Sequence, residues 1–280
     1  MSQNTEWQRK IEEYCREFNL PIDHLVDTLR EPKVIPMIRG KSFEFSAVNS
    51  LKKVLSDMTW DVTKTPMNAQ QGSHDVDVLV THKPTGTKIR VECKLAGKGR
   101  YRFIDDNHSD IGVKCMRSRT LGTSMVATLA PQFGVTESQL AIHNDQYLPT
   151  DFDVVLTSIA NAFYITDPIT EQFVWNPSGE AKTFLSKLSE KDIDDLQSFT
   201  FNQMYLTKTT DIVISKNTGI KCTRRACTAQ DSCGFIPNYP VIKFENVKPT
   251  NNWSSIGDAE AFFTSLVQGS RQTKAATRAN

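Results

Sequence analysis

The sequence contains no long hydrophobic segment. No apolar run approaches the roughly 18 residues that a membrane-spanning helix requires, and the first residues, MSQNTEWQRK, are too polar for a secretory signal. We therefore expect no membrane partner and a cytoplasmic location. The sequence also lacks the GxxxxGK[ST] motif of a phosphate-binding loop, so we expect no nucleotide cofactor.

Cysteines are few. Six among 280 residues are too dilute for a disulfide framework, and this predicts reduced thiols. Cys222, Cys227 and Cys233 lie close together in the sequence, but they lack the CxxC spacing of a zinc site and a nearby fourth ligand. A remote histidine could complete such a site, but we interpret these three cysteines as free thiols.

The chain has almost no excess charge of either sign. Thirty-three basic and 32 acidic residues give a net charge of +1, which excludes a protein that coats nucleic acid through its overall charge. A site for a polyanion must therefore come from local clustering of basic residues. The hydrophobic content of 39% and the charged content of 23% are typical of a folded, soluble protein.

Hydrophobic periodicity predicts both helices and strands along the chain, which indicates the α/β (α+β) class. Helical patterns cover residues 7–18 and 22–30, and a longer one begins at Ser42. Alternating patterns around Pro84 and Gly86 predict a β-hairpin. The later expectations, in order, are a basic loop, a largely helical region at 113–143, strands at 152–167 and 172–177, a helix at 179–188, strands at DIVIS and PVIKF, a closing helix and a frayed tail.

The register of the hairpin decides which charged residues meet. If a four-residue turn connects the strands, Asp77 faces Glu92 and Asp75 faces Lys94, while the valines pack on the other face. A bulge at Gly86 would shift the register and place the two acids Asp77 and Glu92 on opposite faces.

Two opposed carboxylates repel each other unless a cation bridges them, and oxygen ligands suit Mg²⁺. Lys94 would lie beside the ion, where it can orient a water and stabilise charge on an attacked phosphate. The alternative is a solvated face on which Glu92 and Lys94 form an ion pair worth about 0–1 kcal/mol. Two other Glu-x-Lys patterns, at 31–33 and 180–182, lie at a proline and on a predicted helix, so they do not form an equivalent site.

At these residues the sequence resembles the PD-(D/E)XK nuclease superfamily, and within it a type II restriction endonuclease. The resemblance rests on Asp77, a gap of 14 residues and Glu92-Cys93-Lys94, after a helix that carries Glu44. It covers roughly residues 40–175, in the order helix, hairpin, helix and strand. No proline precedes Asp77, so Asp75 stays a rival for the first ligand.

The resemblance implies a restriction-endonuclease-like core, with a central mixed β-sheet flanked by helices. It also implies a catalytic set of Asp77, Glu92, Lys94 and Glu44. The metal would be held by the carboxylates of Asp77 and Glu92 and by the backbone carbonyl of Cys93. Lys94 would lie beside the attacking water, and Glu44 would be an outer acid that orients water or the metal shell.

Basic residues cluster next to the hairpin and again near the last three cysteines, which favours a groove lined with phosphate contacts. Arginine is the residue best able to read guanine edges, so the arginines at 117, 119, 224 and 225 are candidates for base contacts. The predicted DNA-binding residues are Lys98, Arg100, Arg102, Lys114, Arg117, Arg119, Arg224 and Arg225.

These features predict a Mg²⁺-dependent type II endonuclease that cleaves double-stranded DNA at a short specific sequence. A homodimer is expected, because one such site cuts one strand of a symmetric target. The alternatives are a repair or recombination nuclease of the same fold and a noncatalytic nucleic-acid-binding module. We expect a single domain, 1–280, with an N-terminal helical segment (1–38), a catalytic core (39–177) and a part for DNA recognition or dimerisation (178–280).

Overall fold

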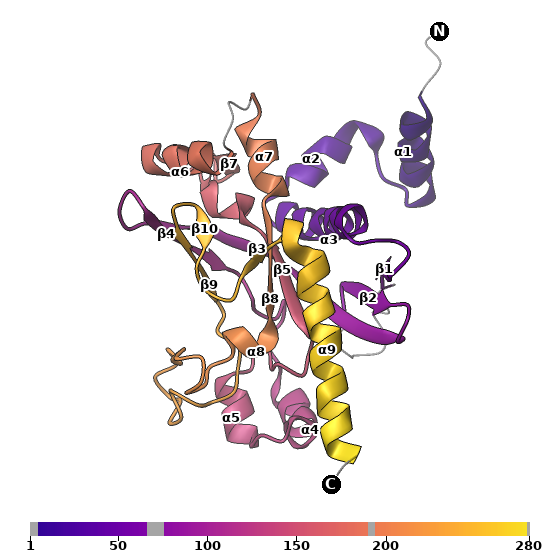
Figure 1. The fold of residues 1–280 in the computed structure, drawn as a ribbon. Coiled ribbons are helices and arrows are strands. Elements are labelled where there is room, and N and C mark those ends of the chain that lie inside the picture. The colour runs from indigo at the N-terminus through magenta and orange to yellow at the C-terminus, as the bar shows by residue number, and fades with distance from the viewer. Residues whose placement is uncertain (1–4, 66–75, 190–193, 279–280) are drawn as a thin grey trace.

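The computed structural model describes residues 5–65, 76–189 and 194–278. A large mixed β-sheet lies at its centre with helices packed around it (Figure 1), as predicted for the fold class. The strands of this sheet are β1 (Trp60–Lys64), β2 (Val78–His82), β3 (Thr87–Phe103), β4 (His108–Val113), β5 (Val154–Ser158), β8 (Met204–Lys208), β9 (Val241–Glu245), β10 (Lys248–Pro249) and β11 (Ser254–Ser255).

The sheet order is β10-β9-β4-β3-β5-β8-β11, and β2 pairs with both β1 and β3. Only β3 and β5 are parallel; the other pairs in the described ranges are antiparallel. Two short strands, β6 (Tyr164–Thr166) and β7 (Phe173–Trp175), form a separate hairpin. Strands from the middle and the C-terminal part of the chain thus share one sheet.

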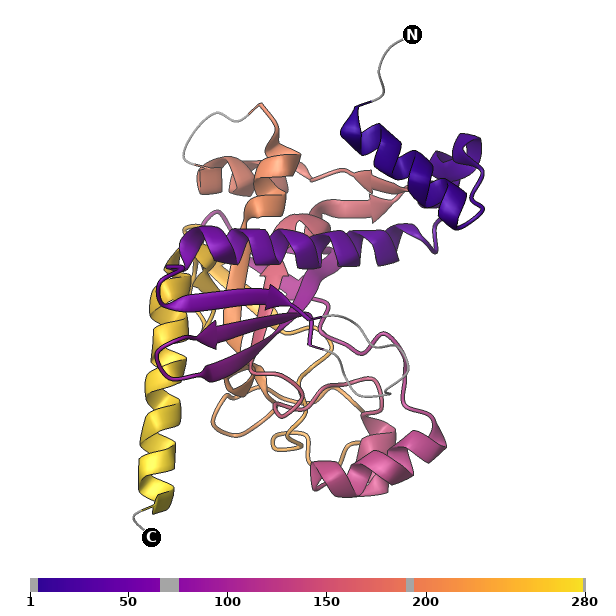
Figure 2. The same cartoon turned by 90° about the vertical axis from the view of Figure 1, so that its right-hand side faces the viewer.

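The helices surround this sheet. They are α1 (Glu6–Glu17), α2 (Leu25–Arg30), α3 (Ile35–Val54), α4 (Thr123–Phe133), α5 (Glu137–Ile142), α6 (Gly179–Ser189), α7 (Leu196–Asn202), α8 (Thr209–Ile212) and α9 (Ala259–Arg278), with 3-10 turns η1 (Ile22–His24), η2 (Ile159–Phe163) and η3 (Ile256–Asp258). Figure 2 shows α3 lying along one side of the β1–β2–β3 meander, with α9 near the end of α3. None of the helices in the described ranges combines the length and apolar character needed to cross a membrane.

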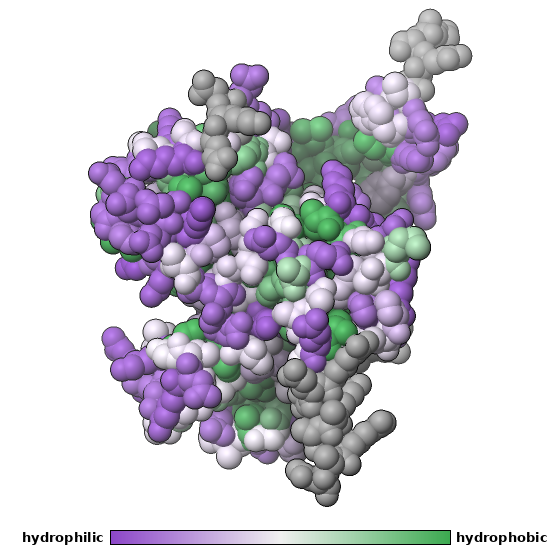
Figure 3. All heavy atoms as spheres, viewed as in Figure 1, coloured by the Kyte–Doolittle hydropathy of each residue, from purple (hydrophilic) through white to green (hydrophobic). Residues whose placement is uncertain are grey.

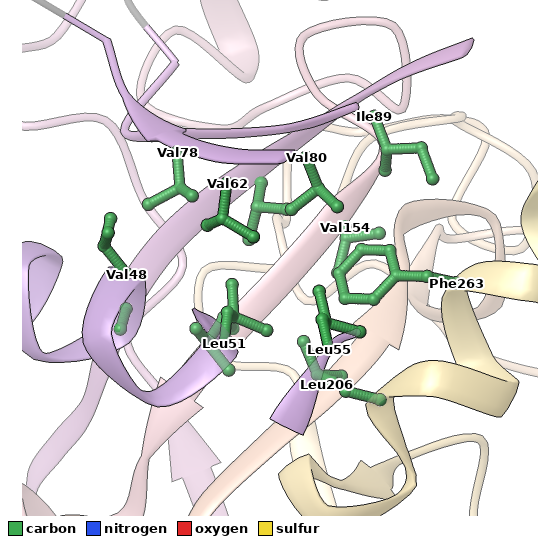
Figure 4. Packing of buried hydrophobic residues seen from close by; sticks show 14 of the residues in the cluster. Val48, Leu51, Leu55, Val62, Val78, Val80, Ile89, Val154, Leu206 and Phe263 are labelled. Atoms are coloured by element: carbon green, nitrogen blue, oxygen red, sulfur yellow. The ribbon is translucent and has the colours of Figure 1, made fainter. Parts of the chain in front are cut away.

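The main core fills the space between these two helices and the sheet. Leu51 of α3, Leu55 directly after it and Phe263 of α9 pack with Val80 of β2 and Leu206 of β8 (Figure 4). Apolar residues recur on one face of α3 and at alternate positions of the strands. The apolar face of the helix therefore packs against the apolar face of the sheet and forms one buried layer.

The third helix begins earlier than predicted. It starts at Ile35 and runs through Gly40 and Ser42 to Val54, with Pro36 in its first turn, where a missing N–H costs no helical hydrogen bond. The expectation that this helix begins at Ser42 was wrong. Glu44 therefore lies in the third turn of α3.

The predicted basic loop after the hairpin was also wrong. Residues 97–102 belong to β3, which continues to Phe103 and pairs with β4. The pairing is irregular between Ala96 and Tyr101, where Gly99 has a φ of 64°. Strands β1, β4 and β8 and the two-residue strands β10 and β11 were not predicted, although in β1 the buried Trp60 and Val62 alternate with Asp61 and Thr63.

Several smaller expectations also changed. The region 113–143 is helical only in α4 and α5, which Gly134, with a φ of 66°, separates. The predicted strand at 152–167 splits into β5, η2 and β6, and DIVIS forms the end of α8 and a turn instead of a strand. The last helix extends to Arg278, so the expectation of a frayed tail over the last ten residues was wrong for residues 271–278.

Candidate active site

The hairpin adopts the register that brings the predicted site together. Val78 pairs with Val91 and His82 pairs with Thr87, and the Gly86 N–H donates to the His82 carbonyl at 2.8 Å. Gly86 has a φ of 67°, which closes the turn without shifting the register. The prediction that the valines pack inward is confirmed, since Val78 and Val91 are fully buried.

Asp77 lies where the β2–β3 ladder ends. Its Oδ2 accepts a hydrogen bond from the Cys93 N–H at 2.9 Å, so a side chain takes the place of the next strand contact. On this edge of β3 the β2 ladder stops at Val91 and the β4 ladder starts at Ala96. The other edge stays paired with β5 through this stretch. Among the described strands, the edge of β3 around Cys93 is therefore left without a ladder partner.

Glu92 and Lys94 lie in this interval. The Glu92 side chain is buried, and its Oε1 contacts Lys94 Nζ at 2.6 Å. The Tyr147 hydroxyl donates to Glu92 Oε1 at 3.2 Å and accepts from Lys94 Nζ at 3.2 Å. Because these contacts are buried, the alternative interpretation, in which Glu92 and Lys94 form a weak ion pair on a solvated face, was wrong. Tyr147 follows α5, far along the chain, and no local sequence signal placed it here.

Glu44 approaches the same region from α3. Its carboxylate is buried and lies between two ammonium groups, Lys41 Nζ at 2.6 Å and Lys64 Nζ at 2.7 Å. The helix and β1 therefore bring a third acid close to Asp77, together with the cations that offset its charge.

The electrostatics of the site distinguish the acid from the lysine. Burial and, to a smaller extent, the nearby Glu92 and Glu44 carboxylates together raise the pKa of Asp77 to about 7, against the opposing effects of Lys94 and of the Cys93 N–H hydrogen bond. Burial alone would lower the pKa of Lys94, but the adjacent Glu92 outweighs it, so the pKa lies well above its ordinary value. Asp77 is thus poised to lose a proton near neutrality, whereas Lys94 remains an ammonium ion.

The donor set at this edge suits a hard cation. Asp77 and Glu92 supply carboxylate oxygens, and the backbone carbonyl of Cys93, the residue after Glu92, lies on the strand segment where the ladder is interrupted. A cation here would relieve the repulsion that raises the pKa of Asp77. The rival first ligand, Asp75, lies outside the described residues.

Three of the predicted DNA-binding arginines form ion pairs with acidic side chains of the protein itself. Arg117 is mostly buried and pairs with Asp151 at 2.7 Å, and its Nε donates to the Gln146 carbonyl. Arg224 pairs with Asp145, and Arg102 pairs with Asp110. Arg117 and Arg224 hold segments of the fold together, which leaves little of either guanidinium for DNA.

The other basic residues lie on the surface. Lys114, Arg119 and Arg225 are exposed. Lys98 is also exposed and contacts the Thr166 hydroxyl, and the exposed Arg100 stacks over the Tyr239 ring with its Cζ 4.1 Å from the ring centroid. These five residues are therefore accessible to a polyanion that binds at the surface.

Comparisons with known proteins add no further constraint. No family model matches the sequence, no curated protein matches it, and no solved structure matches the fold. The functional assignment therefore rests on the residues and geometry of the site itself.

Proposed function

We propose that this protein is a Mg²⁺-dependent endonuclease of the type II restriction class, with a restriction-endonuclease-like core, that hydrolyses phosphodiester bonds in double-stranded DNA. The observation that carries the proposal is the convergence of Asp77, Glu92 and Lys94 on an interrupted edge of β3. The element order supports it too, because α3, the β2–β3 hairpin, α4 with α5, and β5 follow one another as the resemblance implies.

Mg²⁺ held by Asp77, Glu92 and the Cys93 carbonyl would supply Lewis-acid chemistry at the attacked phosphate. Asp77 must be ionised to bind it, and its raised pKa predicts proton competition for the metal below about pH 7. Lys94 cannot serve as a general base near neutrality because it stays protonated. Its ammonium group orients the water and stabilises the negative charge that develops on the phosphate.

Tyr147 has a positioning role in this proposal. Its hydroxyl bridges Glu92 and Lys94 at 3.2 Å on each side and so holds the two charged groups in a fixed relation. Glu44 is the outer acid in this proposal. Its two lysine partners offset its negative charge and so reduce its repulsion of the other carboxylates.

The proposed DNA surface consists of exposed basic residues, with the buried Arg117 and the Asp145-paired Arg224 left out. A protein that neutralises phosphates with lysine and arginine loses affinity steeply as salt rises. The proposed contacts are Lys98, Arg100, Lys114, Arg119 and Arg225. Arg102, which pairs with Asp110, is exposed and stays a weaker candidate.

The active form is proposed to be a homodimer. One catalytic set cuts one strand, and a second copy related by a two-fold axis would cut the other. Supporting this, α1 and α2 project from the body (Figure 1) and expose large apolar side chains, among them Trp7, Tyr14, Phe18 and Val26. Figure 3 shows hydrophobic atoms exposed beside these helices. Such a face is costly to leave in water and suits a second copy.

The nuclease proposal is tested by incubating the purified protein with a plasmid of known sequence and Mg²⁺. Discrete fragments support a restriction enzyme. Cleavage only at branched or damaged sites would replace it with a repair nuclease, and intact DNA with retained binding would replace it with a noncatalytic module. Asp77→Ala and Lys94→Ala should each abolish cleavage and keep DNA binding. Lys88→Ala, an exposed lysine on the same strand, is the matched control and should cleave normally.

The dimer proposal is tested by mixing subunits. Wild type combined with Lys94→Ala should give heterodimers that nick circular DNA, whereas a monomer on cognate DNA with linear product and no nicked intermediate would contradict it. Tyr14→Glu should shift the protein towards monomer in sedimentation experiments, because it places a charge in the exposed apolar face.

A further inference from the structure

A second cluster of metal-binding side chains lies away from the proposed active site. His143, Cys222, Cys227 and Cys233 are all buried, and one ligand atom from each lies within 4.8 Å of the others. The histidine caps the C-terminus of α5, and the cysteines come from a segment far along the chain. We propose that these four side chains form a structural Zn²⁺ site.

The donor set and its geometry favour zinc. Three thiolates and an imidazole are the ligands of tetrahedral structural zinc sites, and Zn–S bonds of about 2.3 Å place sulfur atoms about 3.8 Å apart. The ligand atoms already lie within about 1 Å of that separation. Since the protein provides all four ligands and buries them, no position is left open for a reacting water, and the site is structural.

The surroundings orient the ligands as a metal requires. The Gln146 Nε2 donates to the Ile236 carbonyl at 2.9 Å, which directs the Gln146 Oε1 towards the His143 ring. His143 Nδ1 meets that oxygen at 2.5 Å and must therefore carry the proton. The Nε2 lone pair is then available to the metal, and an outer hydrogen bond of this kind typically fixes a metal-bound histidine.

Backbone N–H groups also interact with the cysteines, which packing of apolar side chains alone would not require. The Arg224 backbone N–H donates to Cys222 Sγ at 3.4 Å, and the Phe235 backbone N–H interacts with Cys233. His143 stacks on the Phe235 ring with centroids 4.3 Å apart. A purely apolar core could be built without an imidazole among three thiols, so the interpretation as unrelated free thiols accounts poorly for this arrangement.

The segment that carries the cysteines has no secondary structure that would hold it against α4 and α5. Residues 213–240 contain no helix or strand, yet Ile214, Phe235 and the three cysteines are buried against α4 and α5. Figure 1 shows this segment beside α5 at the lower end of the molecule. A structureless loop of this length in a compact protein is uncommon unless another element holds it. A metal bound both to His143 and to the three cysteines of this segment would supply that restraint.

The site also lies close to the proposed catalytic set in the chain. The Ile236 N–H, on the segment that follows the cysteines, donates to the Tyr147 carbonyl at 2.8 Å, and Tyr147 lies only four residues after His143. Zinc would thus hold the backbone from which Tyr147 reaches Glu92 and Lys94.

The test is metal analysis of the protein purified without chelators. We expect one zinc per chain, and replacement by Co²⁺ should give the intense visible d–d bands and sulfur-to-cobalt charge transfer of a tetrahedral thiolate site. Cys227→Ala should lose the zinc, whereas the matched control Cys115→Ala, which removes a buried thiol elsewhere, should keep it. Asp77→Asn should also keep it, which separates this site from the proposed magnesium site.

Stability and proteolysis give a second readout. Removal of zinc from the wild type should lower its Tm and expose residues 213–240 to protease, and added Zn²⁺ should reverse both changes. If Cys227→Ala fails to fold, the zinc content and cobalt spectrum of the wild type decide the question. A folded wild type that carries no zinc and gives no cobalt–thiolate bands, or one with a disulfide among these cysteines, would overturn the proposal.

Discussion

Replacement of Asp77 by Asn should stabilise the metal-free protein at neutral and alkaline pH. The carboxylate is buried beside Glu92 and Glu44, and its pKa rises from an ordinary 3.8 to about 7. A difference of about 3 in pKa corresponds to a destabilisation of about 4 kcal/mol once the group is forced to ionise. Asn has nearly the same shape, and its side-chain carbonyl can still accept the hydrogen bond from the Cys93 N–H.

The sign of the pH dependence follows from the raised pKa. Below about pH 4 Asp77 is protonated in both the folded and the unfolded state, so it contributes no difference. Between about pH 4 and pH 7 the folded state holds the proton that the unfolded state has lost, and the stability of the wild type falls as pH rises. The advantage of Asp77→Asn should therefore grow across this window and level off at up to about 4 kcal/mol above it.

Urea unfolding at a series of pH values measures this advantage. The buffers must be freed of divalent cations in advance without a chelator, because a chelator would also remove zinc from the site proposed at His143. Added Mg²⁺ should stabilise the wild type and leave Asp77→Asn nearly unchanged. Asp61→Asn, an exposed acid on β1, is the control and should show no pH-dependent gain.

A variant that is no more stable than the wild type at about pH 8 would refute this reasoning. It would mean that Asp77 ionises in the folded protein without penalty and that the three acids do not repel one another. The same outcome would remove the main physical reason to expect a bound cation at this edge of the sheet.

Three further predictions concern positioning, packing and DNA contacts. Tyr147→Phe removes hydrogen bonds to two charged groups, worth about 1.5–3 kcal/mol each, and should lower the cleavage rate about 10–100-fold with little change in KM; an unchanged rate would exclude the positioning role. Leu51→Ala should lower the free energy of unfolding by about 2–5 kcal/mol in urea titrations, and a smaller loss would mean that the α3 face packs loosely. Arg117→Ala should destabilise the fold by about 3–5 kcal/mol, because it leaves the buried Asp151 without its ion-pair partner. Replacement of the exposed Arg119 by Ala should reduce only the salt dependence of DNA binding. The reverse pattern would mean that Arg117 belongs to the DNA-binding surface.

The sequence by itself determined the elements whose signals are local. Alternation of valines with charged residues, and a turn that contains Gly86, predicted the β2–β3 hairpin before any contact was known. The sequence left two registers open, and the structure has the one that was predicted to bring Asp77 and Glu92 together. The apolar face of α3 and its acid Glu44 followed from helical periodicity in the same way.

Local signals failed where a neighbour decides the structure. Helix-compatible residues before Ser42 and the glycine-rich stretch at 97–102 each had an ambiguous pattern, and contacts with α2 and β4 selected helix in one case and strand in the other. Propensity differences of a few tenths of a kcal/mol per residue are easily overridden by the burial of a whole strand.

Only the tertiary structure assembled the groups that come from distant segments. Tyr147 reaches Glu92 and Lys94 from beyond α5, Arg117 is withdrawn from the surface by Asp151, and His143 joins three cysteines that the sequence spacing did not connect. The physical reason is the range of the interactions. Periodicity acts over a few residues, whereas a hydrogen bond, an ion pair or a metal site depends on which distant surfaces pack together, and the whole core decides that packing.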